Sequence, residues 1–362
     1  MDRQWHIRTS GRKLKVENSP VKRTEVNAAG LAQEDYKGRP STLCPGCGHN
    51  TISSQILAAC YELNLIPEKI VKFSGIGCSS KSPTYFLERS FGFNGLHGRM
   101  PSLALGALFA DRSVKGIGIS GDGDTASIGF GQFKHLVRRN VPMVYIIENN
   151  GVYGLTKGQF SATADKGLKL KHQGENKLMP IDLAMEALVS GASFVARSFA
   201  GDAKQVRELI KAAIRHDGIA VIDIISPCVT FNNLDDTLHS YIWGRANETP
   251  LHDLSFIPDK KAIILENFEA GTVQAVELHD GSVIMLKKLN KDYDPTDRYA
   301  AMQMLEEAEK DHLLLTGLIY IEPTKRTFFD QFDLVEIPLN RLQTSRLRPD
   351  SKQLDQLNAN MY

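Results

Sequence analysis

The sequence has few cysteines and no long apolar run. Only five of its 362 residues are cysteine, too few for a disulfide scaffold, so a closely spaced pair indicates metal or redox chemistry. No stretch approaches the roughly 18 consecutive apolar residues of a membrane-spanning helix, and the first 24 residues are basic and polar without the apolar core of a signal peptide. These absences predict a soluble, cytoplasmic protein that does not bind membranes.

An excess of charge of one sign is lacking as well. Lysine and arginine number 43 against 42 aspartate and glutamate, for a formal net charge of +1. No overall electrostatic attraction to polyanions follows from this balance, and no nucleic-acid partner is expected. The composition is 42% hydrophobic and 23% charged, which is typical of a globular chain that buries a sizeable core.

Helical and strand-like patterns alternate between residues 41 and 250. The strand-like runs are 69–77, 114–120, 142–148, 193–199 and 219–225, and the helical patterns are 51–65, 101–112, 125–140, 182–192 and 203–217. This alternation predicts an α/β fold with a doubly wound, mainly parallel sheet. Residues 1–40 are predicted to form an N-terminal arm. Residues 251–362, with a hairpin turn at Asp280-Gly281, are predicted to form a C-terminal α+β extension.

A glycine-rich turn, GDGD at residues 121–124, follows one predicted strand and precedes a helix. A helix N-terminus in this position presents backbone N–H groups to a phosphate. A carboxylate that faces a diphosphate is repelled unless a divalent cation lies between them. Asp122, with Asn150 and the Val152 carbonyl after the next strand, supplies the oxygen ligands that Mg²⁺ prefers. The pattern therefore predicts a diphosphate cofactor bound through Mg²⁺.

The same turn also satisfies a loose dinucleotide fingerprint, because Gly121 and Gly123 are followed by Ala126. A nicotinamide-dependent dehydrogenase is therefore an alternative. In such a unit the second strand ends in an acidic residue that binds the ribose hydroxyls, whereas here it ends in Asn149-Asn150. The acidic residue in the phosphate turn itself favours the magnesium–diphosphate interpretation.

Two segments around this turn resemble a known family. GDGDTASIGFGQF (121–133) and ENNGVYGLTKGQ (148–159) are similar to thiamine diphosphate enzymes, and most closely to the β subunit of 2-oxoacid:ferredoxin oxidoreductases. The resemblance covers roughly residues 40–245 and implies the thiamine diphosphate-binding fold. It also implies oxidative decarboxylation of a 2-oxoacid, with 2-oxoglutarate favoured, in which coenzyme A yields acyl-CoA and CO₂ and electrons pass to ferredoxin. A separate α subunit, in an αβ or α2β2 assembly, would hold the other end of the cofactor.

Four cysteines are candidate metal ligands. Cys44 and Cys47 place two thiolates on one tight turn, which suits Zn²⁺ or a corner of an iron–sulfur cluster. Cys78 and Cys228 each follow a predicted parallel strand, so both are expected at the sheet edge that carries the GDGD turn. The residues alone leave a structural zinc open, and with it a non-redox thiamine diphosphate lyase or carboligase. The resemblance implies a [4Fe–4S] cluster on all four cysteines.

The resemblance also implies further site residues within the matching motifs. The expected cofactor contacts are His49, Ser80, His97, Arg99, Gly121, Asp122, Gly123, Asp124, Asn150, Gly154 and Leu155. The candidates for binding and converting the substrate are Lys81, Thr156 and Lys157, which lie in loops at strand ends. The alternative for each is structural: a histidine can cap a helix, an exposed lysine is commonly only solvated, and a loop threonine often satisfies nearby backbone groups.

Overall fold

The computed structural model describes most of the chain between residues 26 and 361. The described ranges are 26–156, 158–170, 173–226, 228–229, 263–265, 268–277, 283–290, 293–311, 313–338 and 341–361. Three sequence predictions lie outside these ranges: residues 1–25 of the N-terminal arm, Lys157, and the turn at Asp280-Gly281.

Helices and strands alternate through the described chain. The strands are β1 (Ile70–Ser74), β2 (Phe91–Asn94), β3 (Lys115–Gly121), β4 (Met143–Asn149), β5 (Val152–Tyr153), β6 (Gln159–Phe160), β7 (Lys169–Leu170), β8 (Gly174–Glu175), β9 (Phe194–Phe199), β10 (Ile219–Ile225), β11 (Val273–Glu277), β12 (Val283–Lys288) and β13 (Leu313–Ile321). The α-helices are α1 (Gly48–Glu62), α2 (Met100–Ala110), α3 (Phe130–Arg138), α4 (Leu183–Val189), α5 (Ala203–Arg215), α7 (Arg298–Lys310), α8 (Phe328–Gln331), α9 (Thr344–Leu347) and α10 (Ser351–Ala359). Shorter helical turns are η1 (Gln33–Tyr36), η2 (Pro67–Lys69), η3 (Ser79–Tyr85) and the π-helical η4 (Gly123–Ile128).

One nine-stranded sheet forms the centre of the fold, in the order β11-β12-β13-β9-β10-β4-β3-β1-β2. The strands from β9 to β2 in this order run parallel to one another, whereas β13 is antiparallel to β9 and β11 is antiparallel to β12. The predicted α/β fold with a mainly parallel sheet is confirmed. The chain leaves β1 for the edge strand β2 and returns to β3 on the other side of β1, so strand order reverses between β1 and β3. Ligands of open parallel sheets bind at such a reversal.

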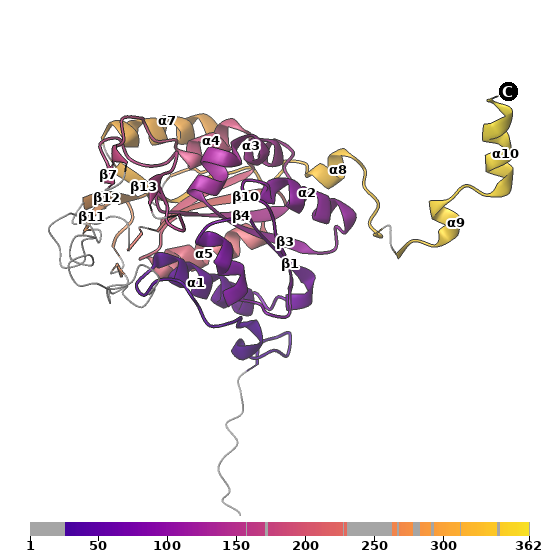
Figure 1. Ribbon diagram of the computed structural model, residues 1–362, viewed down its shortest axis with the longest axis horizontal. Helices are drawn as coiled ribbons and strands as arrows, with labels where there is room; N and C mark the ends of the chain where they lie inside the picture. The colour runs from indigo at the N-terminus through magenta and orange to yellow at the C-terminus, as the bar shows by residue number, and fades with distance from the viewer. Residues whose placement is uncertain are drawn as a thin grey trace, which may run out of the picture.

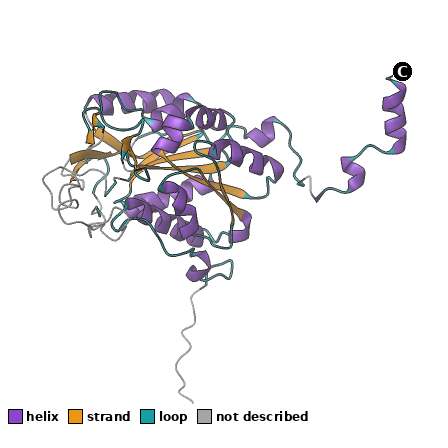
Figure 2. Ribbon diagram, viewed as in Figure 1, coloured by secondary structure: helices purple, strands orange, loops and turns teal. Residues whose placement is uncertain are grey.

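Helices cover both faces of this sheet. In Figure 1, α1 and α5 lie below the strands, while α2, α3, α4 and α7 lie above them, and Figure 2 shows the strands between the two helical layers. Side chains alternate between the two cores: Val144 and Ile146 of β4 pack with the α1 and α5 layer, and Tyr145 and Ile147 pack with the other. Because both faces are covered, every residue of β4 is buried.

The helix predicted over residues 125–140 is divided in two. The segments η4 and α3 meet at Gly129, where a Cβ atom would lie 2.6 Å from the Asp124 carbonyl oxygen and 2.8 Å from the Gly98 carbonyl oxygen. Glycine is therefore required for the Gly98 loop to approach the turn so closely. The apolar pattern did not reveal this break, because Ala126 before it and Phe133 after it enter the same core.

The C-terminal part of the chain extends the same sheet. The predicted antiparallel pair is formed by β11 and β12, helix α7 follows it, and β13 joins the sheet beside β9. Helices α9 and α10 lie away from the sheet, at the far end of the C-terminal segment (Figure 1).

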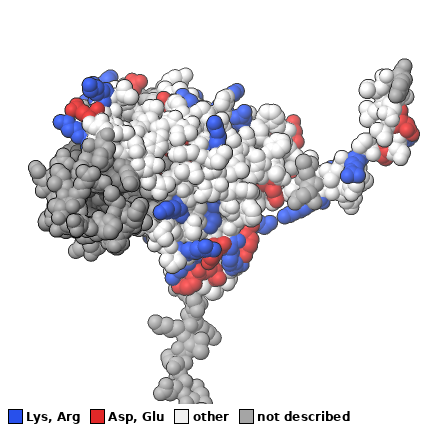
Figure 3. Space-filling view, viewed as in Figure 1, with Lys and Arg blue, Asp and Glu red and all other residues white. Residues whose placement is uncertain are grey.

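Acidic and basic side chains occur together on the surface. The face in Figure 3 shows both signs near each other, as expected from the balanced composition. The same face has a broad area without charged side chains. Within the described residues, no helix combines the length and the apolar character needed to cross a membrane.

A buried histidine lies far from the carboxyl edge of the sheet, at the loop that enters β10. His216 is 8% exposed, and its Nε2 lies 2.7 Å from the Ser193 hydroxyl oxygen. Burial, assisted by the Lys115 ammonium group, lowers the pKa of His216 to about 4. The ordinary value is about 6.5, so the folded chain binds this proton more weakly than the unfolded chain.

Acid is therefore expected to destabilise the chain. The contribution of His216 is complete above about pH 6.5 and is lost as the pH falls toward 4, and buried His49 acts with the same sign. We expect His216→Gln to reduce the loss of unfolding free energy between about pH 7 and pH 5 by about 2 kcal/mol. Urea denaturation at the two pH values measures this, and an unchanged loss would contradict the assignment.

Candidate active site

The carboxyl ends of four neighbouring parallel strands, β1, β3, β4 and β10, meet at one edge of the sheet. A hollow of about 470 Å³, including its solvent-open part, lies at this edge. It is lined by His49, Ile76, Gly77, Cys78, Ser79, His97, Gly121, Asp122, Gly123, Asp124, Glu148, Asn150, Val152, Tyr153, Gly154, Leu155 and Thr156. Sequence motifs more than 100 residues apart thus form one site.

Glycines keep the floor of this hollow open. A Cβ atom on Gly123 would lie 2.5 Å from the ring of Tyr153, and one on Gly121 would lie 3.0 Å from the Ser79 hydroxyl oxygen. The Tyr153 hydroxyl also donates to the Gly123 carbonyl at 3.1 Å. The turn therefore brings bare backbone close to the space that a ligand would enter, as a diphosphate site requires.

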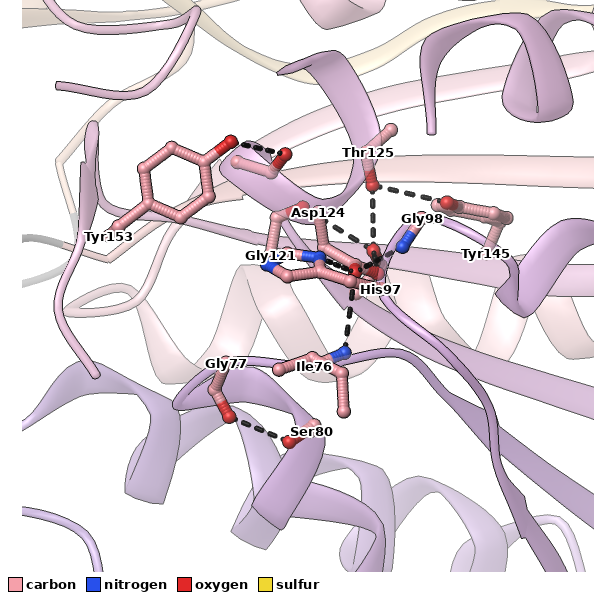
Figure 4. A network of polar contacts seen from close by, with 12 residues as sticks. Ile76, Gly77, Ser80, His97, Gly98, Gly121, Asp124, Thr125, Tyr145 and Tyr153 are labelled. Atoms are coloured by element: carbon pink, nitrogen blue, oxygen red, sulfur yellow. Dashed lines mark hydrogen bonds and ion pairs between the residues drawn. The ribbon is translucent and has the colours of Figure 1, made fainter. Parts of the chain in front are cut away.

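Asp124 is the centre of a polar network beside this turn (Figure 4). Its Oδ1 accepts hydrogen bonds from the backbone N–H groups of Gly98, at 2.7 Å, and Ile76, at 3.2 Å, and pairs with His97 Nδ1. Its Oδ2 accepts from the Ser120 hydroxyl at 2.7 Å. The carboxylate thus fastens the loops after β1 and β2 to the turn after β3. Because Nδ1 of His97 is held by Asp124, its other ring nitrogen remains for a ligand.

Asp122 and its neighbours offer only oxygen atoms to a cation. Asp122 is 1% exposed, and burial raises the pKa of its carboxyl group above the ordinary value. Its Oδ1 accepts from the Asn150 backbone N–H at 3.2 Å, and Asn150 Oδ1 accepts from the Val152 N–H at 3.1 Å. A buried carboxylate, an amide oxygen and a nearby carbonyl fit a hard divalent cation such as Mg²⁺, which would offset the cost of burying the negative charge.

His49 and Glu148 form a buried pair at the base of the hollow. Burial lowers the pKa of His49 to about 4, so its ring is neutral near pH 7, and burial raises the pKa of Glu148 well above its ordinary value, which favours the protonated carboxyl group. The two side chains approach to 3.8 Å, too far for a direct hydrogen bond. His49 Nδ1 lies 2.8 Å from the Ser226 hydroxyl oxygen, and both carboxyl oxygens of Glu148 lie within 2.9 Å of the Ser82 hydroxyl oxygen.

The four predicted ligand cysteines lie along the same edge. Cys47 is the residue before α1, Cys78 is the residue before η3, and Cys228 follows β10. Burial raises the pKa of Cys47 and Cys78, and nearby thiols raise it further: Cys228 and Cys44 act on Cys47, and Cys44 acts on Cys78. Thiols in such surroundings ionise when a metal replaces their protons. Among the described residues, however, no three Cys, His, Asp or Glu side chains are placed to hold one metal ion.

The turn that carries Cys78 is fastened to the sheet by a buried lysine. Lys72 of β1 donates hydrogen bonds to the carbonyl oxygens of Pro83 and Phe86, each at 2.7 Å, and Leu87, at 2.8 Å. Burial lowers the pKa of this ammonium group to about 8, so it remains mostly charged at neutral pH and keeps its three donors. Lys72 therefore holds the end of η3 and the residues after it against strand β1.

Removing the Lys72 side chain is expected to lower the free energy of unfolding. Lys72→Met leaves three buried carbonyl oxygens without their donor, and we expect a loss of roughly 3 kcal/mol in unfolding free energy. Urea denaturation against Lys69→Met, a change at an exposed neighbouring lysine, provides the measurement. Equal stability of the two variants would show that the three bonds contribute nothing.

The other predicted residues divide into two groups. Gly154, Leu155 and Thr156 line the hollow with the residues described above. Ser80 donates its hydroxyl to the Gly77 carbonyl at 2.6 Å, and Arg99 is exposed at the start of α2. Neither of these two is among the described lining residues.

Lys81 is also absent from the described lining, although its charge acts on Cys78. The hydroxyl of Thr156 donates within its own loop, to the Tyr153 carbonyl at 3.4 Å and to Gln159. In the described part of the chain, most of the predicted cofactor residues therefore line the hollow, whereas Thr156 alone of the predicted substrate residues does so.

Several lining residues were not predicted from the sequence. Ser79 and Glu148 line the hollow, and Tyr153 packs on Gly123. Glu148 is the next-to-last residue of the buried strand β4, and a charged residue within an otherwise apolar run was the available signal for it. Ser79 had no such signal, because its neighbour Ser80 is chemically identical.

Comparisons with known proteins agree with this geometry. The family model for "Thiamine pyrophosphate enzyme, C-terminal TPP binding domain" matches residues 75–224. The family model for the C-terminal part of the pyruvate ferredoxin oxidoreductase beta subunit matches residues 285–336. The first match contains the turn after β3 and the end of β4. The second contains most of β12, α7 and β13.

Relatives of known sequence decide the family. The 2-oxoacid:ferredoxin oxidoreductase subunit beta of Saccharolobus solfataricus is 45% identical over 195 residues, which are 53% of this chain and 63% of that protein. The 2-oxoglutarate synthase subunit KorB of Methanocaldococcus jannaschii is 36% identical over 193 residues, which are 53% of this chain and 71% of that protein. The chain belongs to the β subunits of the 2-oxoacid:ferredoxin oxidoreductases. The predicted resemblance is confirmed.

A solved structure extends the family likeness to nearly the whole chain. The 2-oxoglutarate:ferredoxin oxidoreductase of Magnetococcus marinus, with 2-oxoglutarate, coenzyme A and succinyl-CoA bound, matches with a TM-score of 0.68 and 29% identity over 90% of this chain and 96% of that chain. Sequence similarity is narrower, because the chain spans 63% of the length of the Saccharolobus β subunit and 61% of an Aeropyrum pernix β subunit. The structural match therefore covers 90% of this chain, whereas the sequence match to the Saccharolobus β subunit covers 53% of it.

Proposed function

We propose that this chain is the cofactor-bearing β subunit of an enzyme that oxidatively decarboxylates a 2-oxoacid in the presence of coenzyme A. The products would be acyl-CoA, CO₂ and reduced ferredoxin. The observation that carries the proposal is the shared sheet edge of two groups, the diphosphate turn with Asp122 and the cysteines at 44, 47, 78 and 228. Family membership supports it.

The lining residues fit the implied cofactors. Asp122, Asn150 and the Val152 carbonyl would hold Mg²⁺, and the glycines of the turn would lie against the diphosphate. His49, held through Nδ1 by Ser226, would turn Nε2 toward the same group. Bound there, thiamine diphosphate supplies the nucleophile for decarboxylation, and a [4Fe–4S] cluster supplies the one-electron acceptor that a simple decarboxylase lacks.

A structural zinc and an iron–sulfur cluster place their four cysteine sulfur atoms at different separations. Four thiolates around one Zn²⁺ lie about 2.3 Å from the ion and therefore close to one another. In a [4Fe–4S] cluster each cysteine binds its own iron, so the sulfur atoms are farther apart. In the part of the chain that the structure describes, no three of these side chains are placed for a single ion, yet Cys47 interacts with Cys44 and Cys228, and Cys78 interacts with Cys44. Membership of the 2-oxoacid:ferredoxin oxidoreductase β subunits supports the redox enzyme over a non-redox lyase or carboligase with zinc.

The favoured substrate is 2-oxoglutarate, and the expected partner is an α subunit. Several relatives are 2-oxoglutarate synthase subunits, and the matching solved structure holds 2-oxoglutarate. Lys81, Thr156 and Lys157 are proposed to bind the substrate carboxylate or to act on the substrate. The hollow is partly open to solvent, which suits a site that is completed by a second polypeptide.

A substrate panel tests the proposal. The complex is purified anaerobically through an affinity tag on this chain, and viologen reduction is followed with 2-oxoglutarate, pyruvate, and branched and aromatic 2-oxoacids. We expect reduction that requires thiamine diphosphate, Mg²⁺ and coenzyme A and is fastest with 2-oxoglutarate. Colourless protein that contains zinc and decarboxylates without reducing viologen would establish the lyase instead.

A further inference from the structure

A loop between β6 and β7 is hydrogen-bonded to the segment after β4 and to η4, next to the GDGD turn. The Ser161 N–H donates to the Gly151 carbonyl at 3.1 Å, and the Ala162 N–H donates to the Ser127 hydroxyl oxygen at 3.0 Å. The first bond ties the loop to the segment after β4, and the second ties it to η4, which follows the GDGD turn. The next residue, Thr163, is therefore held at a fixed place above the ends of β3 and β4.

The Thr163 hydroxyl joins the two strand ends. Its oxygen lies 2.9 Å from Asp122 Oδ2 and 2.9 Å from Asn149 Oδ1. The carboxylate oxygen and the amide oxygen are both acceptors, so the single proton of the hydroxyl is shared between them. With the Asn150 N–H on Oδ1, each carboxylate oxygen of Asp122 has a hydrogen-bond donor.

The Asn149 amide is itself fixed from the other side. Its Nδ2 donates to Asp223 Oδ1 at 3.1 Å, so its oxygen must face Thr163. Asp223 Oδ2 accepts from Arg197 Nε at 3.0 Å, and Arg197 also pairs with Asp182. Asp223 and Arg197 are 1% and 4% exposed. A buried chain of polar contacts thus runs from Arg197 to the carboxylate of Asp122.

We propose that Thr163 is a positioning residue for the divalent cation, because its hydroxyl fixes the plane of the Asp122 carboxylate before the cation binds. The inference rests on the proposed function, since it assumes Mg²⁺ on Asp122. A carboxylate rotates about its last bond, and a partner that stops this rotation lowers the cost of ordering the ligand when the metal arrives. Removing such a partner typically weakens metal binding by about 10- to 100-fold.

The alternative is that Thr163 only satisfies a buried carboxylate and supports the loop. That role would appear as a loss of stability without a specific change in the requirement for metal. Two kinds of replacement separate the roles. Thr163→Val keeps the shape and removes the hydroxyl, and Thr163→Ala removes it without leaving a new methyl group in its place. Thr163→Ser keeps the hydroxyl.

The test uses the complex purified anaerobically through an affinity tag on this chain and stripped of cofactor and divalent cations. Thiamine diphosphate is held constant, and its binding is followed by calorimetry as Mg²⁺ is titrated, with a parallel titration by Mn²⁺ followed by electron paramagnetic resonance. Melting temperature and iron content are recorded for each variant. Thr316→Val, at a buried threonine in β13, is the matched control.

We expect Thr163→Val and Thr163→Ala to raise the Mg²⁺ dissociation constant about 10- to 100-fold, with iron content unchanged. Thr163→Ser and Thr316→Val should stay within about threefold of the parent complex. Wild-type affinity in Thr163→Val, or equal weakening in Thr163→Ser, would overturn the positioning role while leaving the proposed function intact. Binding of thiamine diphosphate by the parent complex without any divalent cation would overturn both.

Discussion

Replacing Cys78 with alanine is expected to remove the iron–sulfur cluster and with it the reduction of an external electron acceptor. Cys78 lines the hollow directly before η3, and it interacts with Cys44 at the edge of the sheet. A cubane cluster that loses one of four thiolates is open to solvent at that iron. We expect viologen reduction below about a thousandth of the parent rate, and loss of the broad absorbance near roughly 400 nm.

Cys60 offers a matched control for this change. It is a buried cysteine within α1, 0% exposed, and burial raises the pKa of its thiol to about 12. Cys60→Ala should keep both the iron and the activity, because this side chain packs as a small apolar group. A Cys78→Ala complex that keeps a full complement of iron would exclude Cys78 as a ligand.

The second large effect is expected at Asp122. Asp122→Asn keeps the size and hydrogen-bonding shape of the side chain but removes the negative charge that a divalent cation needs. We expect Mg²⁺-dependent binding of thiamine diphosphate to weaken at least about 100-fold, and decarboxylation to be lost with it.

The cluster provides an internal check on this variant. The cysteines lie on other segments of the chain, so Asp122→Asn should keep its iron and its colour. Asp111→Asn, at the end of α2, is the control for loss of a carboxylate elsewhere. Normal cofactor binding by Asp122→Asn at low Mg²⁺ would contradict the assignment of this residue as a metal ligand.

The sequence predicted the sheet and the turn because their signals are local. Strands such as β4 and β10 are short apolar runs, and GDGD lies directly between a strand and a helix. The meeting of the GDGD turn, Asn150 and the cysteines at one place was predicted from one rule, that the carboxyl ends of parallel strands lie at the same edge of a sheet. The break at Gly129 was not predictable in this way, because it depends on the close approach of Gly98 from a different loop.

The contacts that orient the site were also beyond the sequence patterns. Thr163 lies 41 residues from Asp122, and Ser82 lies 66 residues from Glu148. A serine or threonine in a loop gives no sign of which distant group it will contact. The ligands themselves stand in recognisable motifs, whereas the residues that hold them in place become visible only when the loops are folded together.

In the proposed enzyme, the Asp122 turn and the four cysteines form one site, in which electrons pass from a 2-oxoacid to a cluster. The most direct test is electron paramagnetic resonance of the anaerobic complex, frozen after addition of 2-oxoglutarate and coenzyme A with no external acceptor present. We predict the signal of a reduced [4Fe–4S] cluster, absent without 2-oxoacid and absent in Cys78→Ala. A complex that contains iron and thiamine diphosphate, consumes the 2-oxoacid and leaves the cluster oxidised would contradict the account.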